Sequence, residues 1–159
     1  MNIKIPTQLL GLLMMTVSPL TMAHTYSSFI GSTPTSKAVL QTTCYDDGNG
    51  PPAALIVGLQ SVSKRNYLLK LTATTGSFSG TTNDPINGDR ASGPLATVSD
   101  GGDDGSVSTA TFTITIEKTK KKPNAADSTL NGKGVFSLTF HCWSSTKQHT
   151  GTTDIYRLQ

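Results

Sequence analysis

Strict alternation of apolar and polar residues along residues 135–143 is the sequence feature that most constrains the fold of this chain. A period of two is typical of a half-buried antiparallel strand, with one face toward a core and the other toward solvent. The predicted core face consists of Phe136, Leu138, Phe140 and Cys142, and the predicted outer face of Ser137, Thr139 and His141. This one strand therefore carries one of the two cysteines and one of the three histidines.

Similar short alternating segments recur along the chain, and no segment after residue 23 shows a sustained helical period. The candidate strands lie at residues 24–32, 38–44, 54–60, 67–73, 95–98, 111–116, 135–143 and 149–159. We expect two hairpins among them, one joining 54–60 to 67–73 and one joining 111–116 to 135–143. Short strands with polar turns predict an all-β fold, an antiparallel β-sandwich of immunoglobulin-like shape.

Residues 1–23 have the pattern of a secretory signal peptide. Lys4 precedes an apolar run at residues 9–17, and Thr21 and Ala23 place small residues at the two positions that a signal peptidase reads. The run is too short for a membrane span and is interrupted by Pro19. We therefore expect a periplasmic or secreted protein with a single domain at residues 24–159, no membrane span after cleavage, and His24 as the first mature residue.

The charge of the chain is too small to indicate a nucleic-acid partner. Removal of the leader takes away Lys4, the one charged residue before His24, and lowers the formal charge from +3 to +2. A nucleic-acid surface needs a broad basic face, and the one basic run, at residues 118–122, ends at Pro123. We interpret this run as a solvated connection between strands.

The two cysteines, Cys44 and Cys142, are expected to pair, because disulfides form and persist in an exported protein. A bridge closing so long a loop stabilises the folded chain by about 4–5 kcal/mol in the chain-entropy treatment. With both sulfur atoms in a disulfide, a metal site would have to be built from nitrogen and oxygen ligands.

The histidines supply the sharpest chemical hypothesis. If His24 is the first mature residue, its α-amino nitrogen and its imidazole can chelate one metal ion, an arrangement that suits Cu(II). A further imidazole, from His149 or His141, would complete a T-shaped nitrogen site. The opposing interpretation is that His24 is an ordinary chain end and that the other two are ordinary half-exposed residues.

A β-sandwich that is exported and begins at a histidine resembles the histidine-brace copper proteins. The likeness is carried by His24 and by the segment 149–156, which is similar to the last strand of the CopC-like periplasmic copper-binding proteins; lytic polysaccharide monooxygenases are more distantly similar. The loop at residues 44–52 and the His-Thr-Gly-Thr at 149–152 are also similar in outline to segments of small bacterial exported proteins. The resemblance implies a periplasmic copper carrier or buffer more readily than copper-dependent oxidation.

An alternative function is a non-catalytic surface or adhesive module that docks on another periplasmic or surface protein through a strand edge or through its loops. Its acidic turns could bind calcium, since oxygen-rich loops at one end of a sandwich supply the ligands that Ca²⁺ prefers. The candidate calcium ligands are Asp46, Asp47, Asp100, Asp103 and Asp104. Turn formation is a competing explanation for all of these aspartates.

Hydrolytic motifs do not occur in the sequence: it contains no Gly-x-Ser-x-Gly, His-Glu-x-x-His or Gly-x-x-x-x-Gly-Lys pattern. Glu117 is the single glutamate. A mechanism based on paired carboxylates would therefore depend on aspartates in loops. We expect a binding protein rather than an enzyme.

Overall fold

The computed structural model describes residues 23–86, 88, 93, 95–99 and 108–159, and this part of the chain is built almost entirely of β-strands. The elements in chain order are β1 (His24–Ile30), β2 (Lys37–Tyr45), β3 (Pro52–Ser61), β4 (Tyr67–Thr75), β5 (Phe78–Asn83), β6 (Ala96–Ser99), β7 (Thr109–Lys120), the short 3-10 helix η1 (Asp127–Leu130), β8 (Gly134–Ser144), β9 (His149–Thr152) and β10 (Tyr156–Arg157). The expectation of an all-β chain is confirmed. No helix among the described residues is long and apolar enough to cross a membrane.

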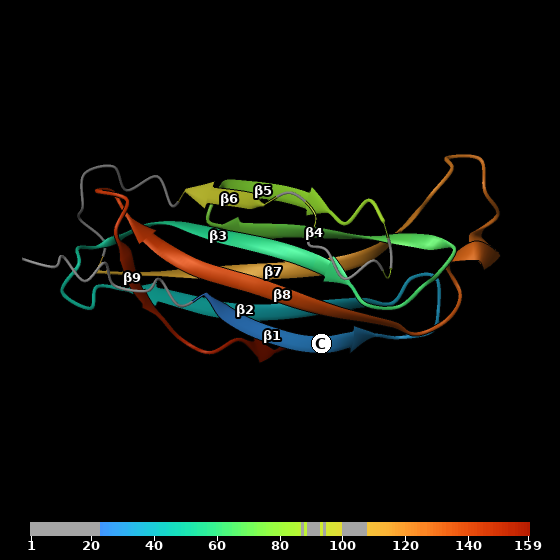
Figure 1. Ribbon diagram of the computed structural model, residues 1–159, viewed down its shortest axis with the longest axis horizontal. Helices are drawn as coiled ribbons and strands as arrows, with labels where there is room; N and C mark the ends of the chain where they lie inside the picture. The colour runs from blue at the N-terminus through green and yellow to red at the C-terminus, as the bar shows by residue number, and fades with distance from the viewer. Residues whose placement is uncertain (1–22, 87, 89–92, 94, 100–107) are drawn as a thin grey trace, which may run out of the picture.

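Every strand pair is antiparallel, and the hydrogen-bonded order is β5-β4-β7-β2-β9-β8-β3-β6, with β1 added to β8 and β10 added to β2. The two ends of this order approach each other, since a Cβ atom on Gly80 of β5 would lie 2.7 Å from the carbonyl oxygen of Thr97 in β6. The sheet therefore curls into an elongated, nearly closed, barrel-like body (Figure 1). The antiparallel architecture is as expected, whereas the immunoglobulin-like arrangement stays a prediction.

The core consists of the alternate side chains that the sequence pattern selected. In β8 the even-numbered residues from 134 to 144 are buried and most of the odd-numbered ones are partly buried, and β7 shows the same alternation. Phe112, Phe136 and Phe140 are among the largest fully buried side chains. Burial of such residues on one face fixes the register, because a shift of one position would expose all of them.

Both predicted hairpins are wrong. Strand β3 pairs with β6 and β8 instead of β4, and β7 pairs with β2 and β4 instead of β8. At each connection the chain crosses from one half of the curled sheet to the other. Two strands that are both apolar on one face can bury it by facing each other across the core as well as by lying side by side.

The predicted disulfide is confirmed: Cys44 of β2 and Cys142 of β8 are bonded, with their Cα atoms 5.7 Å apart. Both residues are fully buried. Strand β9 pairs with both bonded strands at this level, because Thr152 is opposite Cys44 and Thr150 is opposite Cys142. The disulfide thus closes the sheet where β9 joins its two halves.

Candidate metal centre

The site is organised by one edge of β8, which two different strands share. Strand β1 covers residues 134–140 of this edge and begins with His24 opposite Phe140. Strand β9 covers only Cys142 and Trp143, with His149 opposite Trp143. His141 falls at the point between the two partner strands. The register therefore brings the start of the predicted mature chain, the middle of β8 and the start of β9 to one place.

All three histidines of the chain meet there. The ring centroids of His24 and His149 are 6.5 Å apart, and those of His141 and His149 are 5.9 Å apart. All three side chains are partly buried. His149 is thus the central member, with one other imidazole on either side.

Aromatic side chains flank the cluster. The His24 ring lies 5.5 Å from the ring of Phe140, which belongs to the core, and the His141 ring lies 5.7 Å from that of Trp143. Trp143 is the single tryptophan of the chain. Its place beside the histidines follows from the alternation along β8, which puts residues 141 and 143 on the same face.

The environment favours a neutral imidazole at His141. Burial lowers the pKa of His141 below its usual value, and the nearby rings of His149 and His24 lower this pKa further when they are charged. Three imidazoles so close together repel one another when protonated. Neutral imidazole is also the form that binds a metal ion.

The Nε2 atom of His149 is buried and has no hydrogen-bond partner among the described residues. A buried polar atom without a partner is costly, and such atoms in a folded protein call for an explanation. An unpartnered ring nitrogen on the central imidazole of such a cluster has the chemistry of a metal ligand.

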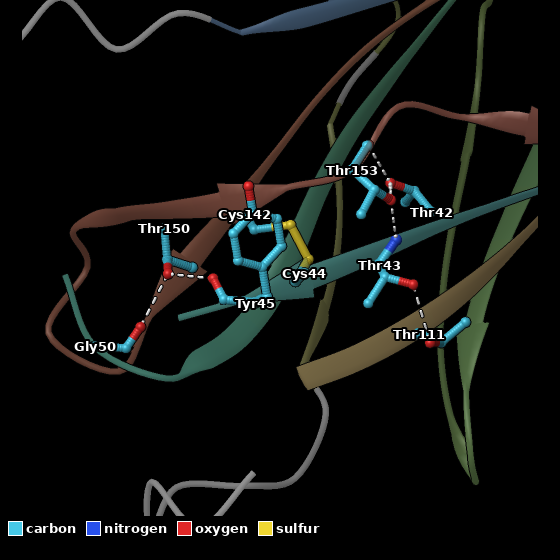
Figure 2. The surroundings of a disulfide bond; sticks show 9 residues. All are labelled: Thr42, Thr43, Cys44, Tyr45, Gly50, Thr111, Cys142, Thr150 and Thr153. Carbon is cyan, nitrogen blue, oxygen red and sulfur yellow. Dashed lines mark hydrogen bonds between the residues drawn. A yellow bond between two sulfur atoms is a disulfide. The ribbon is translucent and has the colours of Figure 1, made fainter. Parts of the chain in front are cut away.

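Strand β9 is held in place by polar contacts to the last residue of β2 and to the loop that follows it. The buried hydroxyl of Thr150 shares its one proton between the carbonyl oxygens of Tyr45, at 2.8 Å, and Gly50, at 2.9 Å (Figure 2). Gly151 packs against the Tyr45 ring, where a Cβ atom would come within 2.4 Å of a ring carbon. These contacts fix the strand that presents His149.

On the other side of the disulfide, the segment after β9 is also tied to β2 (Figure 2). The Thr42 hydroxyl donates to the carbonyl oxygen of Thr153 at 2.9 Å, and the Thr153 hydroxyl accepts the backbone N–H of Thr43 at 2.9 Å. Strand β9 is therefore anchored at both of its ends.

No group of three or more His, Cys, Asp and Glu side chains in the described part of the chain is arranged so that it could hold a metal ion. A site made from two imidazoles and one terminal amine needs only two such side chains. Nitrogen ligands bind at about 2.0–2.1 Å, so two imidazoles on opposite sides of one ion have ring centroids about 6.4 Å apart. The ring centroids of His24 and His149 are 6.5 Å apart, close to this value, and the two ring planes are inclined by 19°.

The start of β1 coincides with the predicted cleavage point. Ala23 is exposed and lies outside any strand, and β1 begins at the next residue. The remainder of the predicted signal peptide, residues 1–22, lies outside the described residues.

The acidic residues proposed as calcium ligands have mainly turn-forming roles where the structure describes them. One Asp46 oxygen accepts the backbone N–H groups of Gly48, at 2.8 Å, and Gly50, at 3.1 Å. An Asp47 oxygen accepts the backbone and side-chain N–H groups of Asn49. The other three candidates, Asp100, Asp103 and Asp104, lie outside the described residues.

Comparison of the chain with known protein families, with curated proteins and with solved structures found no match in any of the three.

Proposed function

We propose that the processed protein is an exported copper-binding protein, a carrier or buffer, whose site is built on the amino end at His24. The observation that carries the proposal is the convergence of His24, His141 and His149 at one edge of β8, with the buried Nε2 of His149 unpartnered among the described residues. The ligands would be the amine and imidazole of His24 and the imidazole of His149, with His141 beside them.

The residue types available after processing favour Cu(II) over Cu(I). Soft sulfur ligands select Cu(I), whereas nitrogen ligands in a planar arrangement suit Cu(II). All four methionines, at positions 1, 14, 15 and 22, precede His24, and the two cysteines form the disulfide. The processed chain would therefore offer copper no thiolate or thioether, and the proposed site binds Cu(II) in preference to Cu(I).

Titration with Cu(II) tests this function. The protein beginning at His24, its mass verified, is titrated while the fluorescence of Trp143 and the electron paramagnetic resonance spectrum are recorded. Trp143 lies 5.7 Å from His141, so copper at the site should quench its emission. We expect saturation at one equivalent, with nitrogen hyperfine structure in the spectrum.

The matched variants are His149→Gln, at the first residue of β9, and the surface change Lys147→Gln, two positions earlier in the connection between β8 and β9. The first should weaken binding and the second should not. Non-stoichiometric quenching, or equal binding by the two variants, would refute the copper proposal.

If the protein is instead a surface module, copper should bind without a defined stoichiometry, and blocking or extending His24 should not change the affinity. It gains little support from Asp46 and Asp47, whose oxygens are engaged in their own turn.

A further inference from the structure

Basic side chains gather at the end of the molecule opposite the histidines. This end is formed by the connection between β3 and β4, the start of β2 and the long connection between β7 and β8 that contains η1 (Figure 1). The connections contact each other, because Arg65 donates to the carbonyl oxygen of Lys133 at 3.0 Å and the Ser63 hydroxyl accepts the N–H of Val135. We call this region the basic end; its exposed cationic residues are Lys37, Lys64, Arg65, Lys121, Lys122 and Lys133.

Few carboxylates balance this charge. The ion pairs within the described residues are Lys70–Glu117 and Lys120–Asp127, and neither uses one of the five exposed lysines of the basic end. Asp84, buried near the same end, accepts the backbone N–H groups of Ser61 and Ile86. The described residues of the basic end therefore carry a net positive charge, although the whole chain has a formal charge of only +3.

Exposed apolar side chains lie among these cations. Phe29 and Val135 are cross-strand neighbours in β1 and β8, and the N–H of Val62 donates to the carbonyl oxygen of Val135 at 2.9 Å. Their exposed fractions are 45% for Phe29, 45% for Val62 and 38% for Val135. The row runs across three neighbouring chain segments on the outer surface of the sheet.

Two cations extend over the aromatic member of this row. The Lys133 ammonium lies 3.7 Å from the centroid of the Phe29 ring, and the Arg157 guanidinium lies 4.9 Å from it. Cations around exposed aromatic and aliphatic side chains can contact headgroups while the apolar groups enter the boundary of the acyl chains.

We propose that the basic end is a peripheral docking surface for a membrane that contains anionic phospholipids. Charge complementarity attracts the cationic residues to the lipid phosphates, and Phe29, Val62 and Val135 enter the interface. Docking by this end directs the histidine cluster, at the far end of the elongated body, away from the bilayer. The inference is independent of copper, since none of these residues belongs to the proposed metal site.

Co-sedimentation with vesicles tests this proposal. The protein beginning at His24 is mixed with vesicles of equal amounts of phosphatidylglycerol and phosphatidylcholine, or with vesicles of phosphatidylcholine alone. We expect binding to the anionic vesicles only, weakening as salt is added, because salt screens the attraction between exposed charges.

The decisive comparison is between two variants that have the same net charge but differ in where the charge was changed. Lys121→Gln with Lys122→Gln removes two positive charges from the basic end, and Lys147→Glu lowers the charge equally in the turn between β8 and β9, near the histidines. The first variant should bind anionic vesicles about thirtyfold more weakly, and the second should bind nearly as well as the unchanged protein. Phe29→Ser should also weaken vesicle binding.

Three results would overturn the docking proposal: equal losses in the two charge variants, equal binding to neutral vesicles, or binding to a soluble polyanion such as an oligonucleotide or polyphosphate without binding to vesicles. Copper titration of the same samples distinguishes failure of the docking proposal from failure of the copper proposal. The basic-end variants should bind copper as the unchanged protein does.

Discussion

His149 is the residue on which the proposed site depends most, because it lies between the other two imidazoles and its Nε2 atom is buried without a partner among the described residues. We predict that His149→Gln weakens Cu(II) binding by tenfold or more, about 1.4 kcal/mol. His141→Gln should have a smaller effect, since His141 flanks the proposed ligands. Competition titration against a chelator of known affinity measures both. Equal effects of the two changes would remove the assignment of His149 as the second imidazole.

The pKa of His141 makes a second prediction at the residue scale. Burial and the neighbouring His149 and His24 lower this pKa in the folded protein, so the unfolded chain binds the proton more readily. Stability gained from this residue is therefore complete above the unfolded pKa of about 6.5 and is lost as the pH falls toward the lowered folded value.

Urea unfolding at pH 7.5 and at pH 5 tests whether His141 makes the folded protein less stable as the pH falls. The unchanged protein should lose more free energy of unfolding on acidification than His141→Gln, which retains every carboxylate. An equal loss in the two proteins would show that His141 does not contribute to acid sensitivity.

At the scale of the element, β9 offers two buried threonines with opposite expectations. Thr150 donates to two carbonyl oxygens, whereas the buried hydroxyl of Thr152 has no partner among the described residues. Thr150→Val should cost about 1–3 kcal/mol, because it leaves those carbonyl groups without their donor. Thr152→Val should be neutral or stabilising.

The two variants make the same chemical change two residues apart, and denaturant unfolding of both compares their free energies of unfolding. A greater loss of free energy of unfolding in the Thr152 variant would contradict this account of β9.

The disulfide joins β2 and β8 on either side of β9. Replacement of Cys44 and Cys142 together by alanine should lower the free energy of unfolding by about 2–5 kcal/mol. The midpoint of urea unfolding measures this loss. Copper affinity should also fall, since β9 presents His149 beside the start of β1. A double variant with unchanged stability would mean that the sheet closes at β9 without the bridge.

The strands themselves could be predicted because alternation is a local property: in residues 135–143 and 111–116, alternate side chains are buried. Strand pairing could not be predicted in the same way. Both expected hairpins assumed that neighbours in the sequence pair in the sheet. Instead, β3 pairs with β8 rather than with β4, and β7 pairs with β2 and β4 rather than with β8.

The candidate site was only partly predictable for the same reason. Residue type and the expected cleavage point selected His24, His141 and His149 from the sequence. Their convergence depends on β1 and β9 sharing one edge of β8, a register set by long-range pairing. The place of Trp143 beside the cluster could have been found from its spacing to His141, but that spacing alone does not indicate a site.

At the scale of the whole molecule, the body is elongated: the starts of β1 and β9, which carry His24 and His149, lie toward one end, and the β3–β4 and β7–β8 connections lie at the other (Figure 1). The rigid sheet separates the two proposed activities. Changes at the basic end should therefore leave copper affinity unaltered, and changes at the histidines should leave vesicle binding unaltered.

The central claim is that copper binding needs a free amino end on His24. It is tested most directly by comparing the Cu(II) affinity of the protein beginning at His24 with that of the same protein extended by Gly-Pro. Proline lacks the amide hydrogen that another residue could lose to form a substitute chelate. We predict one tight equivalent in the first protein and its loss in the second. Equal affinity in the two would contradict the account.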